Sequence, residues 1–461
     1  MGVMRTEMPQ ASDKLLVGAL AGMCSEAEAL ERQRDRQLDR LEWKPGSDPR
    51  QPEVDMALAT KKYQRSSAGK MYCSKEVRSP QVCWQTMKFL LEEVLDLDQR
   101  PSPRFAAPPK SFWEVYAYMH DRSRSVRVDL HLQQPRSSST RAFVECHECS
   151  LRFELLSRFL LQRRPCPPAV PPAPAACPAS PSASSSGAKD SSGGYGSKPV
   201  GEVLAALGQA AGYSERLGLQ AMSQTIDPLL AAYDAARRYA RSGVSFSNED
   251  EAPFVSSCEP VMQRLVLLLL LCTSPSSLPA HLARLGAEVV GHPVVRPAVQ
   301  ACGAFLAGDY SRFLRFYRES DFLSAAAMSS LADLARLRVL WITARAYPHA
   351  VGDKLPLSRL QRMLACGSEE HVRSFLAFHG ISVQDGPDDS QVLFPKRDTP
   401  EAEGHLCTEA ELPDRCDFPA GADELLASKV EGLLRVDVVL DAAGDLSGEG
   451  TSSDVSSEAF L

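Results

Sequence analysis

Residues 142–161 read AFVECHECSLRFELLSRFLL, and their apolar side chains recur every three or four positions. That spacing places the apolar side chains on one face of an α-helix. The same period returns in segment after segment, while strand-like alternation is nearly absent between residues 218 and 347. Short helices joined by short loops predict antiparallel helix pairs stacked as a solenoid of degenerate, tetratricopeptide-like repeats.

Helices are therefore expected over most of the chain. Ser25 followed by Glu28 forms a capping-box pattern at the start of the first one. The expected helices are residues 25–43, 54–63, 82–95, 112–132, 142–161, 218–241, 260–272, 279–290, 294–306, 310–318 and 323–347.

A different pattern begins near residue 351. Two helices are expected at 355–364 and 368–379, with Ser368 as an N-cap and Gly380 as a stop signal. Two strands, 381–383 and 392–394, then flank a polar turn. Helix, helix, strand and strand is the order of a winged-helix module, so the fold class predicted is a mostly α solenoid ending in a winged helix.

Composition shifts divide the chain further. Residues 163–200 are rich in Pro, Ser and Gly, which predicts a disordered insertion. The segment 398–461 carries a net charge of −13 and predicts an acidic, mostly disordered tail with an ordered island at 425–440. Besides this insertion and this tail, the chain is predicted to have four parts. These are a disordered N-terminus at 1–17, two helical parts at 18–162 and 201–350, and the winged helix at 351–397.

The net charge of −7 over 461 residues hides this division. Residues 1–164 carry +5 and residues 165–397 carry +1, so a mildly basic body precedes the acidic tail. Thirteen scattered cysteines fit a reducing compartment better than a disulfide scaffold. The longest apolar run, residues 265–272, is far shorter than the roughly twenty residues of a membrane span, so none is expected.

Enzyme motifs are weak throughout. Cys146 and Cys149 form a C-x-x-C, but no second ligand pair follows at zinc-site spacing and both cysteines fall on an apolar stripe, which favours core cysteines. A metal or hydrolytic enzyme using Cys146, His147 and Cys149 is the minor alternative. The Ala68-Gly69-Lys70 tripeptide lacks the first glycine and the Ser/Thr of a phosphate loop. We therefore expect no catalytic residues, no metal, no cofactor and no small-molecule substrate.

Basic side chains gather in two regions that could contact phosphates, although a solvated helix face or internal ion pairs would give the same pattern. The first lies around the tyrosines at 63 and 72, and the second consists of Arg122, Arg124 and Arg127. The arginines near the predicted winged helix are the alternative surface. The candidate nucleic-acid-binding residues are Lys61, Lys62, Arg65, Lys70, Arg359, Arg362 and Arg373.

Several motifs occur in the order found in one family. Residues 60–70 read TKKYQRSSAGK, residues 121–130 read DRSRSVRVDL, and residues 308–317 read GDYSRFLRFY. Together with an eroded N-terminal block and a terminal Ala-Ser-Lys at 427–429, these segments resemble the SAC/GANP family. The family-motif residues, expected to be structural, are Gly18, Met23, Cys24, Tyr63, Gly69, Asp129, Asp309, Tyr310, Phe313 and Lys429.

This resemblance implies a non-enzymatic scaffold with a PCI-like helical array. It implies as partners a PCI-type protein subunit, a small acidic stabilising subunit and RNA, in mRNA export coupled to transcription at the nuclear pore. The expected location is then the nucleus, including its envelope. The chain lacks long pore-binding repeats and so is similar to short members of the family, for which the alternative is a cytoplasmic, centrosome- or spindle-associated adaptor.

Overall fold

The computed structural model describes residues 16–65, 72–133, 140–161, 214–242, 252–346, 355–387, 389–394, 411–416, 418 and 423–440. The chain divides into two compact units. Unit 1 lies within Met1–Ser157, Arg216–Gln300 and Gly432–Leu461, and unit 2 lies within Arg158–Glu215 and Ala301–Glu431. The predicted insertion at 163–200 lies outside the described residues, as do residues 1–15, 395–410 and 441–461.

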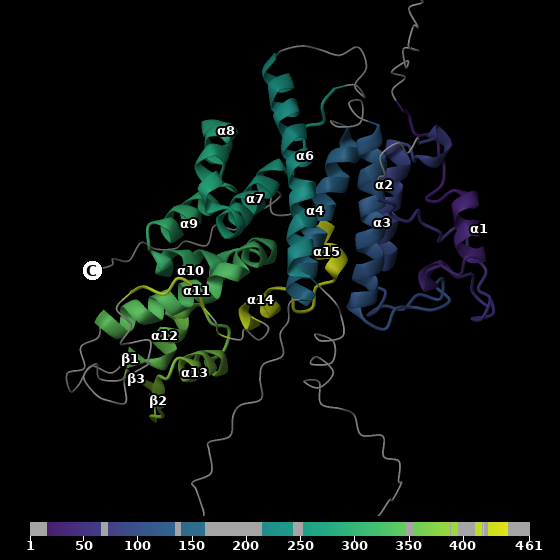
Figure 1. Cartoon of the computed structure of the whole chain (residues 1–461). Helices are drawn as coiled ribbons and strands as arrows, with labels where there is room; N and C mark the ends of the chain where they lie inside the picture. The colour runs from purple at the N-terminus through teal and green to yellow at the C-terminus, as the bar shows by residue number, and fades with distance from the viewer. Residues whose placement is uncertain are drawn as a thin grey trace, which may run out of the picture. The chain divides into compact units, whose positions relative to one another are not determined.

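The described residues are mostly α-helical, as the sequence predicts (Figure 1). The α-helices are α1 (Glu26–Arg34), α2 (Pro80–Phe89), α3 (Phe112–Leu132), α4 (Arg141–Leu161), α6 (Glu215–Ser242), α7 (Glu259–Thr273), α8 (Leu278–Val290), α9 (Arg296–Leu306), α10 (Tyr310–Glu319), α11 (Phe322–Ala346), α12 (Leu357–Leu364), α13 (Glu369–Phe378), α14 (Glu424–Lys429) and α15 (Arg435–Leu440). Short 3-10 turns η1 (Arg40–Glu42), η2 (Ser74–Glu76) and η5 (Pro275–Ser277) and the π-helical turn η3 (Leu90–Val94) lie between them.

The helix predicted at 54–63 is wrong, because this segment is extended or turned. Ala59 N still donates to the Asp55 carbonyl four residues earlier, at 2.8 Å, but several other backbone N–H groups of the segment donate to side chains of distant residues. Thr60 N donates to Glu42 Oε1 at 3.0 Å, Lys62 N to Glu28 Oε1 at 2.8 Å and Tyr63 N to Asp121 Oδ2 at 3.1 Å. These distant partners provide the hydrogen bonds that the backbone N–H groups need, so the segment does not have to form a helix.

The helix predicted at 25–43 is also shorter than expected. It begins as predicted, with the Ser25 side chain accepting from Glu28 N, but α1 ends at Arg34. Arg36 then takes a positive φ of 55°, and the chain turns before η1. That turn brings Glu42 back beside Arg32, which a continuous helix would not do.

Unit 1 has its core between α2, α3, α4, α6 and α7. The Tyr116 and Phe153 rings stack between α3 and α4 with centroids 5.9 Å apart. Tyr233 of α6 donates to the buried Glu148 of α4 at 2.6 Å. Burial raises the pKa of the Glu148 carboxyl. The polar groups of this core are therefore held by one another, as buried polar groups must be.

Unit 2 packs α10, α11 and α12 together, and α13 and a small sheet follow α12 in the chain. The strands β1 (Leu355–Pro356), β2 (Ser382–Gln384) and β3 (Gln391–Leu393) form an antiparallel sheet in the order β1-β3-β2. Val383 pairs with Val392 in its centre. The order α12, α13, β2, β3 agrees with the elements expected in this region, with β1 as an additional strand.

A buried ion pair ties the chain after residue 411 back onto unit 2. Arg336 of α11 is 1% exposed and lies 3.0 Å from the carboxylate of Asp423, the N-cap of α14. Tyr317 of α10 donates to the same carboxylate at 2.6 Å. Burial raises the pKa of Asp423, but Arg336 and these hydrogen bonds outweigh it, so its net pKa is lowered.

The last described helix belongs to unit 1. Both oxygens of Asp96 accept from the first N–H groups of α15, those of Arg435 and Val436, at 3.1 Å. The Arg435 guanidinium also lies over the Phe112 ring, 4.3 Å from its centroid. Among the described residues, no helix is both long and apolar enough to cross a bilayer.

We predict that Asp423→Asn lowers the free energy of unfolding by about 1.5–3 kcal/mol, because the buried Arg336 loses one of its two carboxylate partners and keeps only Asp333 at 2.8 Å. The wild-type contribution should be complete above the unfolded carboxyl pKa of about 4 and lost as the pH falls through the lower folded pKa. Urea unfolding of both forms at pH 7 and pH 3 measures this. The exposed Asp414→Asn is the matched control and should match the wild type at both pH values.

Candidate functional site

The Asp129 carboxylate of α3 is shared by two cations from separate parts of the chain. Lys61 Nζ lies 2.7 Å from one oxygen, and Arg78 Nε lies 2.7 Å from the other. The Arg78 side chain is 0% exposed and donates further to Ser125 Oγ at 2.8 Å. Ser125 Oγ in turn donates to the Lys61 carbonyl at 2.7 Å. One acidic position on α3 thus binds side chains that stand before and after residues 66–71 in the chain.

The backbone of Gly18 packs directly against the backbone of Arg78, which belongs to this cluster. A Cβ on Gly18 would stand 2.4 Å from the Arg78 carbonyl oxygen, which no real side chain tolerates. Gln133 completes the junction, since its amide accepts from Gly18 N at 2.9 Å and donates to the Arg78 carbonyl at 2.9 Å. The family-motif glycine at 18 therefore permits close approach of two backbone segments.

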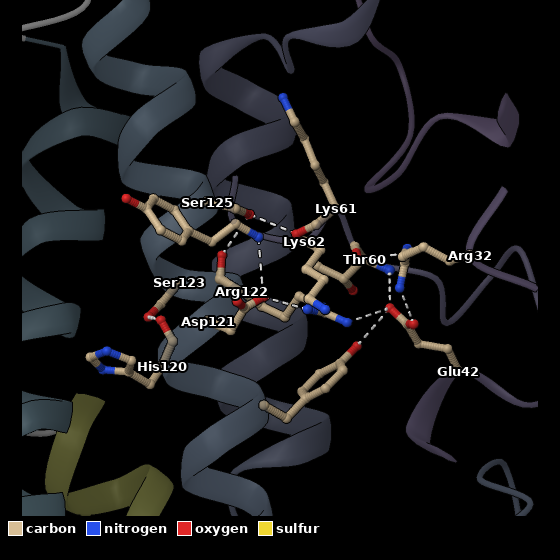
Figure 2. A network of polar contacts seen from close by, with 12 residues as sticks. Arg32, Glu42, Thr60, Lys61, Lys62, His120, Asp121, Arg122, Ser123 and Ser125 are labelled. Carbon is tan, nitrogen blue, oxygen red and sulfur yellow. Dashed lines mark hydrogen bonds and ion pairs between the residues drawn. The ribbon is translucent and has the colours of Figure 1, made fainter. Parts of the chain in front are cut away.

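A second buried carboxylate, Glu42, joins the N-terminal segment to α3 at Arg122, about two helical turns before Asp129 (Figure 2). It is 0% exposed and forms ion pairs with Arg32 and, at 3.3 Å, with Arg122. Arg32 also donates to the Thr60 carbonyl at 3.1 Å. Arg122 lies over the Tyr118 ring, 4.6 Å from its centroid. Two guanidinium groups around one carboxylate give a fully desolvated network, which is costly to disrupt.

Met23 and Cys24 belong to the same junction. The Met23 carbonyl accepts from Lys61 N at 3.0 Å, and Cys24 Sγ accepts from Arg32 Nη2 at 3.4 Å. Burial raises the pKa of the Cys24 thiol to about 11, so the thiol is neutral at pH 7. A neutral buried thiol is a packing group and not a nucleophile.

Tyr63 lies at the edge of this region. Its ring faces Arg124, whose guanidinium carbon is 4.1 Å from the ring centroid. A pocket of about 220 Å³ opens here between α1, the segment around Lys61 and α3. Its charged lining groups include Glu28, whose Oε1 accepts from Lys62 N and lies 3.5 Å from Arg32 Nε. Lys61 and Asp129, which also line the pocket, bind each other.

The basic residues predicted to bind nucleic acid fall into different settings. Lys61 is engaged by Asp129, and Arg373 is engaged by Glu369, Asp385 and Ser390 at 2.6–2.8 Å. Exposed side chains belong to Lys62, Arg65, Arg359 and Arg362. Lys70 and the motif residue Gly69 lie outside the described residues. The exposed four are therefore the better candidates for an external partner.

The motif residues of unit 2 hold the two ends of α10. Gly308 has a positive φ of 82°, and Asp309 then caps α10 by accepting from Arg312 N at 3.1 Å. At the other end, Lys429 Nζ donates to the carbonyl groups of Arg318 at 2.7 Å and Ser320 at 2.5 Å. Burial lowers the pKa of Lys429. The Gly-Asp and terminal Lys motifs thus act on one helix.

Between those ends, α10 turns its aromatic side chains inward. Phe313 is completely buried, and its ring meets the Phe305 ring edge to face at 5.0 Å between centroids. The Tyr310 hydroxyl accepts from Arg338 Nη1 at 2.9 Å. The Phe313 contact joins α10 to α9, and the Tyr310 contact joins it to the long helix α11.

The C-x-x-C residues Cys146 and Cys149 lie in the core of unit 1, as their apolar positions indicate. Burial raises the pKa of both thiols, and burial lowers the pKa of His147 well below its usual value. His147 Nδ1 lies 2.7 Å from the Phe143 carbonyl of the preceding turn. Among the residues that the structure describes, no three His, Cys, Asp or Glu side chains form a metal-sized group.

Sequence reasoning missed the buried charges Arg32, Glu42, Arg78, Arg336 and Asp423. In the sequence each stands among other charged residues and looks like part of a solvated surface. The family-motif residues beside them are the one usable signal, because Lys61 and Asp129 lie in the motif segments 60–70 and 121–130. Their pairing across 68 positions required the tertiary structure.

A sequence model of the SAC3/GANP family matches residues 23–168 and 202–385. The chain belongs to the SAC3/GANP family. These residues carry the Asp129 and Glu42 clusters, and α10 to α13 fall within the second matched range. The family is one of scaffold proteins, and a SAC3-type scaffold role in general follows from this membership.

Three individual proteins that the chain resembles agree with this family membership. The chain is 23% identical to SAC3 family protein B of Arabidopsis thaliana over 376 residues, 80% of this chain and 18% of that protein. It is 24% identical to Protein xmas of Drosophila melanogaster over 406 residues, 86% of this chain and 16% of that protein. It is 28% identical to SAC3 family protein 1 of Schizosaccharomyces pombe over 141 residues, 30% of this chain and 12% of that protein. The chain therefore spans less than a fifth of the length of these relatives.

We predict that Glu42→Gln destabilises the protein by about 3–5 kcal/mol, because Arg32 and Arg122 lose their shared negative charge in a desolvated site. Chemical denaturation followed by circular dichroism measures the change. Glu53→Gln removes an exposed partner of Lys44, so it should cost less than about 1 kcal/mol. Equal costs for the two variants would contradict the role of the Glu42 network.

Gly18→Ala should also destabilise, by about 1–3 kcal/mol, because the added methyl group forces the 18–20 segment away from Arg78. The matched control is Gly303→Ala in α9, where a Cβ meets nothing within 4 Å. That control should be neutral or stabilising, since alanine is the better helix former. Thermal unfolding of the two variants compares them directly, and a stable Gly18→Ala protein would refute the close-packing argument.

Proposed function

We propose that this chain is a non-enzymatic SAC3-type scaffold that binds a PCI-type protein subunit and RNA in nuclear mRNA export coupled to transcription. Family membership carries the proposal. A small acidic stabilising subunit is the second protein partner that we propose, and the nucleus, including its envelope, is the proposed location.

The chemistry of the described residues supports a binding role over catalysis. The polar groups of the motif regions are engaged in structural ion pairs, such as Lys61 and Arg78 with Asp129. The buried cysteines Cys24 and Cys83 have raised pKa values of about 11 and about 12. A general acid, base or nucleophile needs a group free to exchange protons or attack near neutral pH.

The end of unit 2 supports the proposed RNA contact. Arg359 and Arg362 lie three positions apart on α12 and are exposed, while Leu357, Leu360 and Leu364 are buried on the same helix. Neither arginine has an ion-pair partner among the described residues. Two unpaired guanidinium groups on one exposed helical face suit phosphate contacts. Lys62 and Arg65 of unit 1 are a second exposed basic pair.

We predict that Arg359→Gln/Arg362→Gln weakens binding of single-stranded RNA and lowers its dependence on salt. If both residues contact phosphates, the slope of log affinity against log salt should fall by about 1.4, or about 0.7 per contact. Filter binding between 50 and 200 mM salt measures it. Arg34→Gln/Arg50→Gln removes two exposed arginines of unit 1 as the charge-matched control. An equal loss in both doubles would indicate non-specific attraction alone.

Affinity purification of the tagged full chain tests the scaffold role itself. We expect a PCI-type subunit and export factors among the recovered proteins, and a nuclear signal for a fluorescent fusion. Recovery of neither class would contradict the proposal. Centrosomal foci without a nuclear signal would favour the adaptor alternative instead.

A further inference from the structure

The single arginine of α13, Arg373, has its guanidinium group engaged by neighbouring side chains. Arg373 Nε donates to Glu369 Oε1, one helical turn earlier, at 2.8 Å. Arg373 Nη2 donates to Asp385 Oδ1 at 2.6 Å and to Ser390 Oγ at 2.7 Å. Asp385 and Ser390 both lie between β2 and β3, and Ser390 Oγ donates in turn to Asp385 Oδ1 at 3.1 Å. Side chains of the turn after β2 therefore hold Arg373 on the surface of unit 2.

The turn between β2 and β3 is tightly built. A Cβ on Gly386 would stand 2.6 Å from the Asp389 carbonyl oxygen, so these two positions lie in close backbone contact. The Ser390 carbonyl accepts from Leu357 N, at the start of α12, at 2.7 Å. Strand β2 also packs on α13 (Figure 1). These contacts keep Asp385 in place beside α13.

The charge on this side of unit 2 is negative. Among the described residues, α13 and the turn carry four carboxylates against the one guanidinium group of Arg373; the carboxylates belong to Glu369, Glu370, Asp385 and Asp389. In contrast, α12 exposes Arg359 and Arg362 and carries no carboxylate. A phosphate at Arg373 would lie within one Debye length, about 8–10 Å, of the Asp385 and Glu369 carboxylates. A polyanion is therefore attracted to α12 and repelled at α13.

We propose that Asp385 excludes Arg373 from RNA contact. The RNA bound by unit 2 is then confined to the face of α12 that carries Arg359 and Arg362. This inference rests on the proposed RNA contact and adds the residue that decides which helix the RNA reaches. An arginine binds a phosphate strongly when two of its nitrogens can donate in parallel, and Nε and Nη2 of Arg373 already donate to carboxylates.

Filter binding of the full chain to single-stranded RNA between 50 and 200 mM salt tests this role. Asp385→Ala removes both the charge and the acceptor that hold Arg373 Nη2. The slope of log affinity against log salt should then steepen by about 0.7, the value for one further phosphate contact on a single strand. Extrapolated from 1 M salt, such a contact makes binding about fivefold tighter at 0.1 M. An unchanged slope in Asp385→Ala would overturn the proposal.

The control for the lost charge is Asp414→Ala, which removes a carboxylate from another exposed position of unit 2 and should leave the slope unchanged. Adding Arg373→Gln to Asp385→Ala should restore the wild-type slope. A gain that persists in this double variant would mean that Arg373 is not the group released, which also refutes the proposal. All these side chains are at least partly exposed, so circular dichroism should be the same for every variant.

Arg373→Gln in the otherwise wild-type chain gives a second test, which does not depend on the folding of Asp385→Ala. Because Arg373 is withheld from RNA, this variant should change the slope no more than Arg34→Gln, which removes an exposed arginine of unit 1. A slope reduced by about 0.7 in Arg373→Gln alone would show that Arg373 contacts RNA in the wild type, contrary to the proposal.

The same titrations separate this inference from the proposed RNA contact. If Arg359→Gln/Arg362→Gln reduces the slope while Asp385→Ala behaves as wild type, the RNA contact stands and only the role of Asp385 is refuted. If neither the wild type nor Asp385→Ala binds RNA, the proposed RNA contact fails, and this inference fails with it.

Discussion

The ion pairs of the Asp129 carboxylate are the constraint on which the rest of unit 1 depends. Lys61 and Arg78 reach it from both sides, and Gly18 and Gln133 close the contact behind Arg78. A carboxylate that is 1% exposed is tolerated only when cations and hydrogen bonds replace its lost water. The N-terminal segment has few apolar side chains of its own, so this desolvated network, with Glu42 as its second centre, attaches it to α3.

In unit 2, fewer charged groups attach a distant segment of the chain to the helices. Asp423 sits between Arg336 and Tyr317, and Lys429 binds the carbonyl groups at the end of α10. A segment that the sequence presents as part of an acidic tail is thus attached by two charges that point inward. The SAC3/GANP motifs within the described residues gather at these junctions, so their charged residues have structural partners there. They join segments that lie far apart in the chain.

Helices with a clear apolar stripe could be predicted from the sequence. The helix expected at 112–132 has the same bounds as α3, and the order of helices and strands from residue 355 to 394 also agrees. The segment 54–63 could not be predicted, because its backbone amides bind Glu42, Glu28 and Asp121. Side-chain acceptors that lie up to 58 positions away leave no local pattern.

For the candidate site, too, some features could be predicted from the sequence and others could not. The sequence by itself determined which residues are charged, which helices form, and which short motifs mark a SAC3/GANP chain. Only the tertiary structure decided which charges are used internally, as Lys61 and Arg373 are, and which stay exposed, as Arg359 and Arg362 do. The physical reason is that helix period is a local property, whereas the desolvation and pairing of a charge depend on what another segment brings within about 3 Å of it.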